Sequence, residues 1–230
     1  MRTNALFYCL LLAATAACHQ RGQEHLLAGA APVNTPELPV ASDAQADSLL
    51  VDVQVLDSTI RVDARYAGSN NFTGAPLPGY EAPRALLRHE AARALSRVQA
   101  RLRRQGLSLL VFDGYRPVRA TLAMVRWAER SGHRALLTDG YIARRSRHNL
   151  GLAVDLTLVN AQSGSSMDMG TPFDTFSESA HTANAKGRVL TNRRILVRAM
   201  ESEGFRNYEK EWWHFSLDVP GAHPFDRVIR

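Results

Sequence analysis

The sequence predicts an α+β fold, in which a largely antiparallel sheet carries helices packed on one side. Short stretches alternate apolar and polar residues, which is the period of a half-buried strand. One longer stretch repeats apolar residues at three- and four-residue steps, which is the period of an amphipathic helix. Because the strands and helices do not follow a strict β-α-β rhythm, the sheet is expected to be mainly antiparallel.

The first expected elements are two short strands joined by a turn at Asp57 and Ser58. Apolar side chains alternate with polar ones at Val51, Val53 and Val55 and again at Ile60, Val62 and Ala64. Residues 68–83 contain Gly, Asn and Pro, so a loop is expected to follow.

Residues 83–105 predict a long amphipathic helix. Its apolar positions lie three or four residues apart and are Leu87, Ala91, Ala94, Leu95, Val98 and Leu102. Gly106 is expected to end the helix, because glycine readily adopts the left-handed conformation that follows many helices. The apolar run at residues 107–112 predicts a buried strand.

A second helix is predicted over residues 117–130, because the proline that opens this segment is favoured at the first helical position. The apolar run at residues 152–159 predicts a further strand. Residues 195–203 predict a third helix closed by Gly204, and residues 212–217 predict a last strand.

Residues 1–18 predict an export signal. Arg2 supplies the positive charge, residues 5–14 form a short apolar run, and small residues precede the expected cut. The apolar run is too short to span a bilayer comfortably. The protein is therefore expected to be exported, either into the periplasm or as a membrane-anchored lipoprotein that faces the periplasm.

Cys18 is the position at which a bacterial lipoprotein would carry its lipid anchor. The match is imperfect, because Thr15 stands where such signals usually have Leu, so lipidation and plain cleavage both stay open. Cys9, the other cysteine, also lies in the signal, so no internal disulfide is expected in the mature domain. Residues 19–48 are rich in Ala, Pro, Gln, Gly and Asp and predict a flexible linker, which leaves residues 49–230 as a single domain.

The net charge of +6 raises the question of an anionic partner such as nucleic acid. The basic residues are scattered along the chain, as expected for solvated helix faces, and the motifs of nucleic-acid-binding proteins are absent from the sequence. No nucleic-acid partner is therefore expected, and no obligate protein partner is evident.

His148, Asp155 and His214 form a candidate metal site. Two imidazoles and one carboxylate give the ligand count of a catalytic zinc site, which leaves a fourth position for water. Asp155 lies in an apolar run, where a buried carboxylate is costly unless it is paired or binds a metal. A hydrogen-bonded aspartate and packed core histidines are the alternatives.

The spacing of these residues sets a geometric condition. His148 and Asp155 are seven positions apart, and an odd separation on one unbroken strand places two side chains on opposite faces. The chain must therefore bend between them, and Gly151 can bend without steric cost. Glu211 lies three positions before His214, so it is expected at the lip of the last strand, where the chain is still turning.

The pattern Ser-x-His-x-x-Gly-x-Ala-x-Asp at residues 146–155, followed by Glu-x-x-His at residues 211–214, resembles the zinc D-Ala-D-Ala dipeptidases of the vancomycin-resistance type. Those enzymes belong to a wider group of peptidoglycan D,D-peptidases, whose fold is shared with the hedgehog signalling domain. The resemblance runs from about Val51 to the C-terminus. Further matching segments are Tyr66-Ala67, Asn70-Asn71-Phe72-Thr73-Gly74, Asp113-Gly114-Tyr115-Arg116-Pro117 and Asp168-Met169-Gly170-Thr171-Pro172-Phe173-Asp174.

The resemblance implies a metallopeptidase with one zinc ion per chain, held by His148, Asp155 and His214. It places the catalytic carboxylate at Glu211, which would take a proton from the metal-bound water and give it to the leaving amine. It also implies that Arg116 stabilises the oxyanion of the transition state.

The implied substrate is a small free dipeptide, D-Ala-D-Ala, whose two ends must both be recognised. The resemblance implies that Asp174 pairs with the substrate ammonium, aided by Tyr66, and that Ser146 hydrogen-bonds the carboxylate end. The alternatives are a turn aspartate, a core tyrosine and, for Arg116, an ordinary salt bridge such as one to Asp113.

Two other functions stay open. A D,D- or L,D-carboxypeptidase would trim longer peptidoglycan stem peptides, although a carboxylate at Asp174 suits a free amine better. A non-catalytic zinc module that binds cell-wall peptides would need neither Glu211 nor Arg116.

Overall fold

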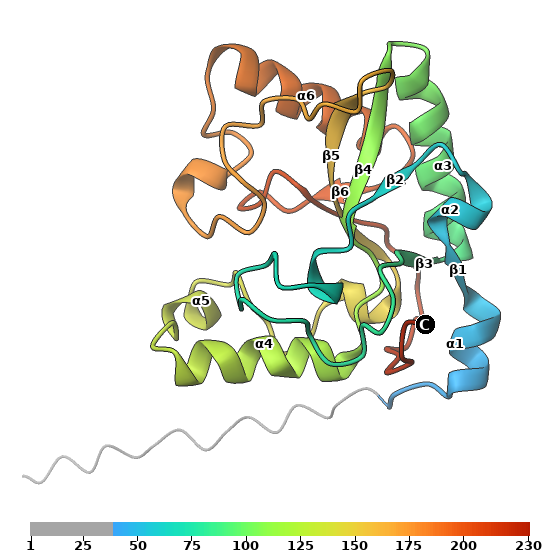
Figure 1. Cartoon of the computed structure of the whole chain (residues 1–230), viewed down its shortest axis with the longest axis vertical. Helices are drawn as coiled ribbons and strands as arrows, with labels where there is room; N and C mark the ends of the chain where they lie inside the picture. Colours follow the sequence, from blue (N-terminus) through green and yellow to red (C-terminus); the bar gives the residue numbers. More distant parts are fainter. Residues whose placement is uncertain (1–38) are drawn as a thin grey trace, which may run out of the picture. The chain divides into compact units, whose positions relative to one another are not determined.

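The computed structural model describes residues 39–230 (Figure 1). The predicted export signal at residues 1–18 and the first twenty residues of the predicted linker lie outside the described residues. Helix α1 spans Asp43–Leu49, so regular structure begins before the expected domain boundary at residue 49. A capping box between Ser42 and Gln45 starts this helix, and Ala46 is buried. The capping pattern therefore indicated a helix in a segment whose composition resembles that of a linker.

The main sheet has five strands in the order β2-β4-β5-β7-β6. Their bounds are Arg61–Val62 (β2), Leu107–Asp113 (β4), Ala153–Asn160 (β5), His214–Ser216 (β7) and Arg206–Asn207 (β6). Only β2 and β4 pair in parallel, and the other three pairs are antiparallel. The predicted α+β class with a largely antiparallel sheet is therefore confirmed.

Helices α3 (His89–Arg103) and α6 (Gly187–Glu201) pack on each other and on the sheet (Figure 1). On β5, Val154, Leu156 and Leu158 belong to the same core cluster as the apolar faces of both helices. Successive side chains of a strand alternate between faces, so the residues between them point away from this core. That alternation directs the side chain of Asp155 toward the opposite face.

Helix α4 (Val118–Arg130) belongs to a second apolar cluster. This cluster joins the buried face of α4 to the turn after β4, the long loop after β2 and the C-terminal segment. Its members from these segments include Tyr115, then Tyr66, Leu77 and Tyr80, and then Phe225 and Ile229. The two clusters together anchor the loops that carry the candidate site residues.

The remaining elements are short. They are α2 (Val53–Leu56), η1 (Arg65–Ala67), α5 (Ala135–Thr138), η2 (Arg147–Leu150), η3 (Glu178–Ala180) and the strands β1 (Leu50–Asp52) and β3 (Leu86–Arg88). Strands β1 and β3 form a separate antiparallel pair. Among residues 39–230, no helix combines the length and apolar character needed to cross a membrane.

Several predicted elements differ from the structure at their bounds. The strand expected through Val55 stops at Asp52, whose side chain caps the short helix α2 by accepting from Gln54 N at 2.8 Å. The helix expected from residue 83 starts only after β3. The third helix starts eight residues before the predicted 195, because its buried face includes the polar residue Arg193 and so lacks an apolar period.

Candidate active site

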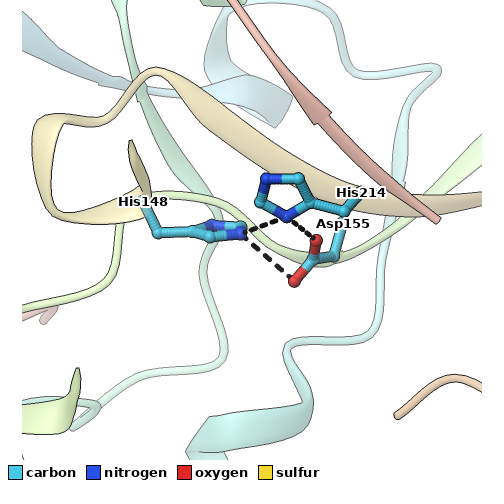
Figure 2. Close-up of side chains that lie close together, drawn as sticks. All are labelled: His148, Asp155 and His214. Carbon is cyan, nitrogen blue, oxygen red and sulfur yellow. Dashed lines mark hydrogen bonds and ion pairs between the residues drawn. The ribbon is translucent and has the colours of Figure 1, made fainter. Parts of the chain in front are cut away.

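Three potential metal ligands, His148, Asp155 and His214, lie close together (Figure 2). Asp155 on β5 lies directly opposite His214 on β7, so both side chains share one face. His214 Nδ1 lies 2.9 Å from Asp155 Oδ1, and His148 Nε2 lies 3.1 Å from His214 Nδ1 and 3.3 Å from Asp155 Oδ2. The structure therefore brings together the three residues that the sequence singled out.

His148 enters this group from the short helix η2 and not from the strand. The hydroxyl of Ser146 caps η2 by accepting from His148 N at 3.2 Å. Gly151 then reverses the chain with a left-handed φ of 67°, and a Cβ there would lie 2.6 Å from Leu50 Cδ2. The bend that the odd spacing required is thus present at Gly151.

The residues present fit a zinc ion. Two ligands that each lie about 2.0–2.1 Å from a tetrahedral ion are about 3.3 Å apart, which matches the spacing of the three ligand atoms. His148 Nδ1 lies 2.6 Å from the carbonyl oxygen of Gly114, which can only accept, so Nδ1 carries the proton and Nε2 keeps its lone pair for a metal. Burial raises the pKa of Asp155, but the two imidazoles outweigh burial and hold this pKa below its usual range.

Glu211 lies beside the ligands in the turn that precedes β7. Its backbone N–H donates to Tyr208 O at 2.9 Å, and its carbonyl accepts from His214 N at 3.2 Å, so the chain is still turning there, as expected. Its carboxylate Oε2 lies 3.9 Å from His214 Nδ1. Burial, with a contribution from the charge of Asp155, raises the pKa of Glu211 to about 8.

Arg116 follows β4 and extends its guanidinium into the same site. Its Nη2 donates to Asp113 Oδ2 at 2.8 Å and lies 3.6 Å from Asp155 Oδ2. Its guanidinium also covers the ring of Tyr66, at 5.0 Å from the centroid. The salt bridge to Asp113 that was the alternative for Arg116 is present, and it holds the cation beside the metal ligands.

Asp174 and Tyr66 are paired at the other side of the site. The Tyr66 hydroxyl donates to the Asp174 carboxylate at 3.0 and 3.1 Å. Asp174 has a left-handed φ of 60°, a conformation that aspartate tolerates better than most residues. Burial and the nearby charge of Asp155 raise the pKa of Asp174 well above its usual range, which favours the protonated form of this carboxyl group.

One pocket of about 300 Å³ contains all eight candidate site residues. They are Tyr66, Arg116, Ser146, His148, Asp155, Asp174, Glu211 and His214. The pocket is at the small end of the range for ligand sites. Four aromatic side chains that were not predicted to line it also do so, namely Phe72, Tyr141, Phe176 and Tyr208.

Sequence reasoning also missed Tyr80, whose hydroxyl donates to Asp113 Oδ1 at 2.6 Å. Asp113 and Tyr80 are 33 positions apart, and Tyr80 lies in a loop without periodicity, so no local pattern could connect them. Of the missed residues, Phe72 alone was inside a segment that the resemblance had marked.

Two imidazoles and a carboxylate around one point, a buried carboxyl group next to them and a guanidinium in the same small pocket define a metal-dependent hydrolase. The chain belongs to the M15 peptidase family, because the family profile described as D-Ala-D-Ala dipeptidase matches residues 46–227.

Individual relatives agree with this family. The chain is 40% identical over 173 residues to a D-alanyl-D-alanine dipeptidase of Enterococcus faecalis, over 69% of this chain and 86% of that protein. It is 31% identical over 177 residues to a D-alanyl-D-alanine dipeptidase of Escherichia coli, over 76% of this chain and 88% of that protein. Among solved structures, a vancomycin resistance D,D-pentapeptidase in complex with Zn(II) matches 58% of this chain and 73% of that chain, with 18% identity and a TM-score of 0.36.

Proposed function

We propose that the protein hydrolyses the dipeptide D-Ala-D-Ala to two molecules of D-alanine. The observation that carries this proposal is that Asp174, a partly buried carboxyl group held by the Tyr66 hydroxyl, shares a pocket of about 300 Å³ with the metal ligands. A group of this kind suits the free ammonium of a very short peptide. Two relatives, each matched by this chain over 86% or 88% of the relative's length, carry the name D-alanyl-D-alanine dipeptidase.

His148, Asp155 and His214 would hold one zinc ion. Bound zinc lowers the pKa of its water towards about 7 and polarises the substrate carbonyl. Proton transfer and stabilisation of the oxyanion are assigned to side chains of the protein.

Glu211 is the group that moves the proton. Its carboxylate lies 3.9 Å from a ligand nitrogen, so it can accept the proton of the attacking water and return it to the leaving amine. The charge of Arg116 favours the ionised form of Glu211, against the burial that raises its pKa. The buried position keeps bulk water from competing for the proton.

Arg116 stabilises the developing negative charge on the carbonyl oxygen. A guanidinium has five N–H donors, and the contacts with Asp113 and Met124 use three of them. Further donors are left for an oxygen in the pocket. A fixed cation of this kind favours the transition state over the ground state.

The two ends of the dipeptide would lie against Asp174 and Ser146. Pairing with an ammonium would remove the proton from Asp174 and leave a charge-assisted contact supported by the Tyr66 hydroxyl. The Ser146 hydroxyl accepts from His148 N, so its own hydrogen is available to a substrate carboxylate.

Aromatic side chains close the pocket near the ammonium end. Phe72 packs edge-on against Tyr66 with centroids 6.1 Å apart, and against Phe176 at 5.1 Å. Tyr141 extends this row at 5.7 Å from Phe176. A stem peptide would have to continue through these side chains, so the row favours a dipeptidase over a D,D- or L,D-carboxypeptidase.

A comparison of three substrates tests the proposal. We expect rapid zinc-dependent hydrolysis of D-Ala-D-Ala, and little hydrolysis of N-acetyl-D-Ala-D-Ala or of a stem pentapeptide. Faster cleavage of the pentapeptide would support the carboxypeptidase. A Glu211→Ala variant that kept full turnover would support a non-catalytic zinc module in place of either enzyme.

We also propose that the protein is exported and acts outside the cytoplasm, on cell-wall-derived dipeptide. The support is the charged, apolar and small-residue pattern of residues 1–18. Fractionation of cells that produce the full chain should recover it outside the cytoplasm. In the same experiment a Cys18→Ser variant would be released from membranes if Cys18 carries lipid, and recovery in the cytoplasm would contradict export.

A further inference from the structure

Asp113 is a buried carboxylate at the end of β4, and both of its oxygens are engaged. In the sheet it lies directly opposite Asp155, so it stands next to a metal ligand. Its Oδ2 accepts from Arg116 Nε at 2.9 Å and from Nη2 at 2.8 Å, and lies 3.4 Å from His148 Nδ1. Its Oδ1 faces the other way and accepts from the Tyr80 hydroxyl at 2.6 Å.

Tyr80 is held firmly relative to the turn that carries Arg116. The preceding residue, Gly79, has a φ of 93°, and a Cβ there would lie 2.9 Å from Pro117 Cγ, so the two segments are in close contact. Tyr80 also pairs with Ile229 of the C-terminal segment, and its ring packs against Tyr66 at 6.0 Å. The hydroxyl therefore has one defined position.

A single hydroxyl at this position fixes the orientation of the Asp113 carboxylate. When Oδ1 is held by Tyr80, Oδ2 must face Arg116, and the guanidinium is held by two parallel contacts to one oxygen. Without the hydroxyl, Oδ1 would be a buried acceptor with no donor, which is costly. The carboxylate would then rotate to seek another partner, and Arg116 would lose its fixed position.

We propose that Tyr80 is a positioning residue for catalysis, which acts through Asp113 to hold the Arg116 guanidinium in the place where the oxyanion forms. The proposal rests on the oxyanion role of Arg116 in the proposed function. Tyr80 does not line the pocket and does not touch substrate, so its effect passes entirely through Asp113 and Arg116.

The matched variants are Tyr80→Phe and Tyr115→Phe, each of which removes one buried phenolic oxygen. Tyr115 lies beside Arg116 in the chain and in the same apolar cluster as Tyr80, but its hydroxyl donates to Arg227 O at 2.9 Å, away from Asp113. We expect Tyr80→Phe to lower kcat for D-Ala-D-Ala by about tenfold, the effect typical of a group that orients the residues of a metal site. We expect KM to change less than about twofold, because an interaction made only in the transition state lowers kcat and kcat/KM equally. Tyr115→Phe should keep the wild-type kcat.

The mechanism is tested by combining Tyr80→Phe with Arg116→Ala. If Tyr80 acts through Arg116, the double variant is no slower than Arg116→Ala alone. A loss that multiplies in the double variant, or a wild-type kcat in Tyr80→Phe, would overturn the proposal. A folded Asp113→Asn variant provides a second route, since it keeps the shape of the side chain and should show the same fall in kcat with a nearly unchanged KM.

The same experiment separates this inference from the proposed function. If the wild-type protein does not cleave D-Ala-D-Ala, or Arg116→Ala keeps the wild-type kcat, the proposed function is at fault and the inference falls with it. If Arg116→Ala loses activity and Tyr80→Phe does not, the inference alone is wrong.

Discussion

Asp155 and His214 occupy opposed positions on β5 and β7, and the Asp155 carboxylate lies 2.9 Å from His214 Nδ1. Two of the three ligands are thus fixed by backbone pairing in the sheet, and only His148 depends on a loop. Rigid strands hold a metal site more accurately than loops do. The site should therefore tolerate changes around its edge but not among the ligands.

Replacing a ligand should remove the metal without unfolding the protein. We expect Asp155→Asn to lower bound zinc from one equivalent to a small fraction of one and to abolish turnover, because a neutral amide is a poor zinc ligand. Metal analysis after dialysis measures this directly. His223→Ala is the control, since His223 is exposed and outside the pocket, and it should retain its zinc. Full zinc occupancy in Asp155→Asn would show that the ion is held elsewhere.

Asp174→Asn should weaken binding of the substrate ammonium. A hydrogen bond to a charged group is worth about 1.5–3 kcal/mol, so KM for D-Ala-D-Ala should rise by about 10- to 100-fold. Asp168→Asn changes an exposed aspartate of the same loop outside the pocket and should leave KM unchanged. The idea fails if N-acetyl-D-Ala-D-Ala, which lacks the ammonium, loses as much from Asp174→Asn as the free dipeptide does.

The raised pKa of Glu211 has a consequence for the stability of the metal-free protein. Its pKa is about 8 in the folded state, against 4.5 for an unperturbed carboxyl group. The folded state therefore binds this proton more tightly than the unfolded state, and the free energy of unfolding falls as pH rises between these two values. A shift of this size corresponds to about 5 kcal/mol.

Glu211→Gln removes that titration and should flatten the pH dependence. Urea denaturation of the two metal-free proteins should give similar stability at about pH 5, with the variant more stable by a few kcal/mol at about pH 9. A difference between wild type and variant that does not change with pH would contradict this burial-driven shift.

Alanine substitution tests whether the bend at Gly151 before β5 requires a residue without a side chain. Gly106 serves as the control position. Both have left-handed φ angles, of 67° and 73°, so alanine at either position costs about 1–2 kcal/mol. A Cβ at Gly106 meets nothing within 4 Å, whereas one at Gly151 lies 2.6 Å from Leu50 Cδ2 and 3.1 Å from Arg88 N. We expect Gly151→Ala to be the more destabilising variant, by about 1 kcal/mol or more, and to lower zinc affinity by shifting His148. Equal loss of stability and unchanged zinc affinity would argue against this.

The parts of the structure that were predictable from the sequence are those with a local physical cause. The long apolar runs give β4 and β5, and the odd spacing of His148 and Asp155 required the bend found at Gly151. The resemblance added Tyr66, Ser146 and Asp174, which line the same pocket as the metal ligands.

The parts that were not predictable depend on contacts between distant segments. The period of α6 is hidden because Arg193 is buried, where it donates to the backbone carbonyls of Met169, Ser179 and His181. Tyr80 reaches Asp113 across 33 positions and carries no motif. Such pairs are fixed by packing, and composition or periodicity cannot indicate them.

The central claim is that one metal ion, bound by His148, Asp155 and His214, is required for dipeptide hydrolysis. Titration of zinc into the metal-free protein, with D-Ala-D-Ala turnover followed at each addition, tests it most directly. Turnover should be absent at the start, rise linearly and reach its plateau at one equivalent of zinc per chain. Full turnover in the metal-free protein, or a plateau at two equivalents, would contradict the claim.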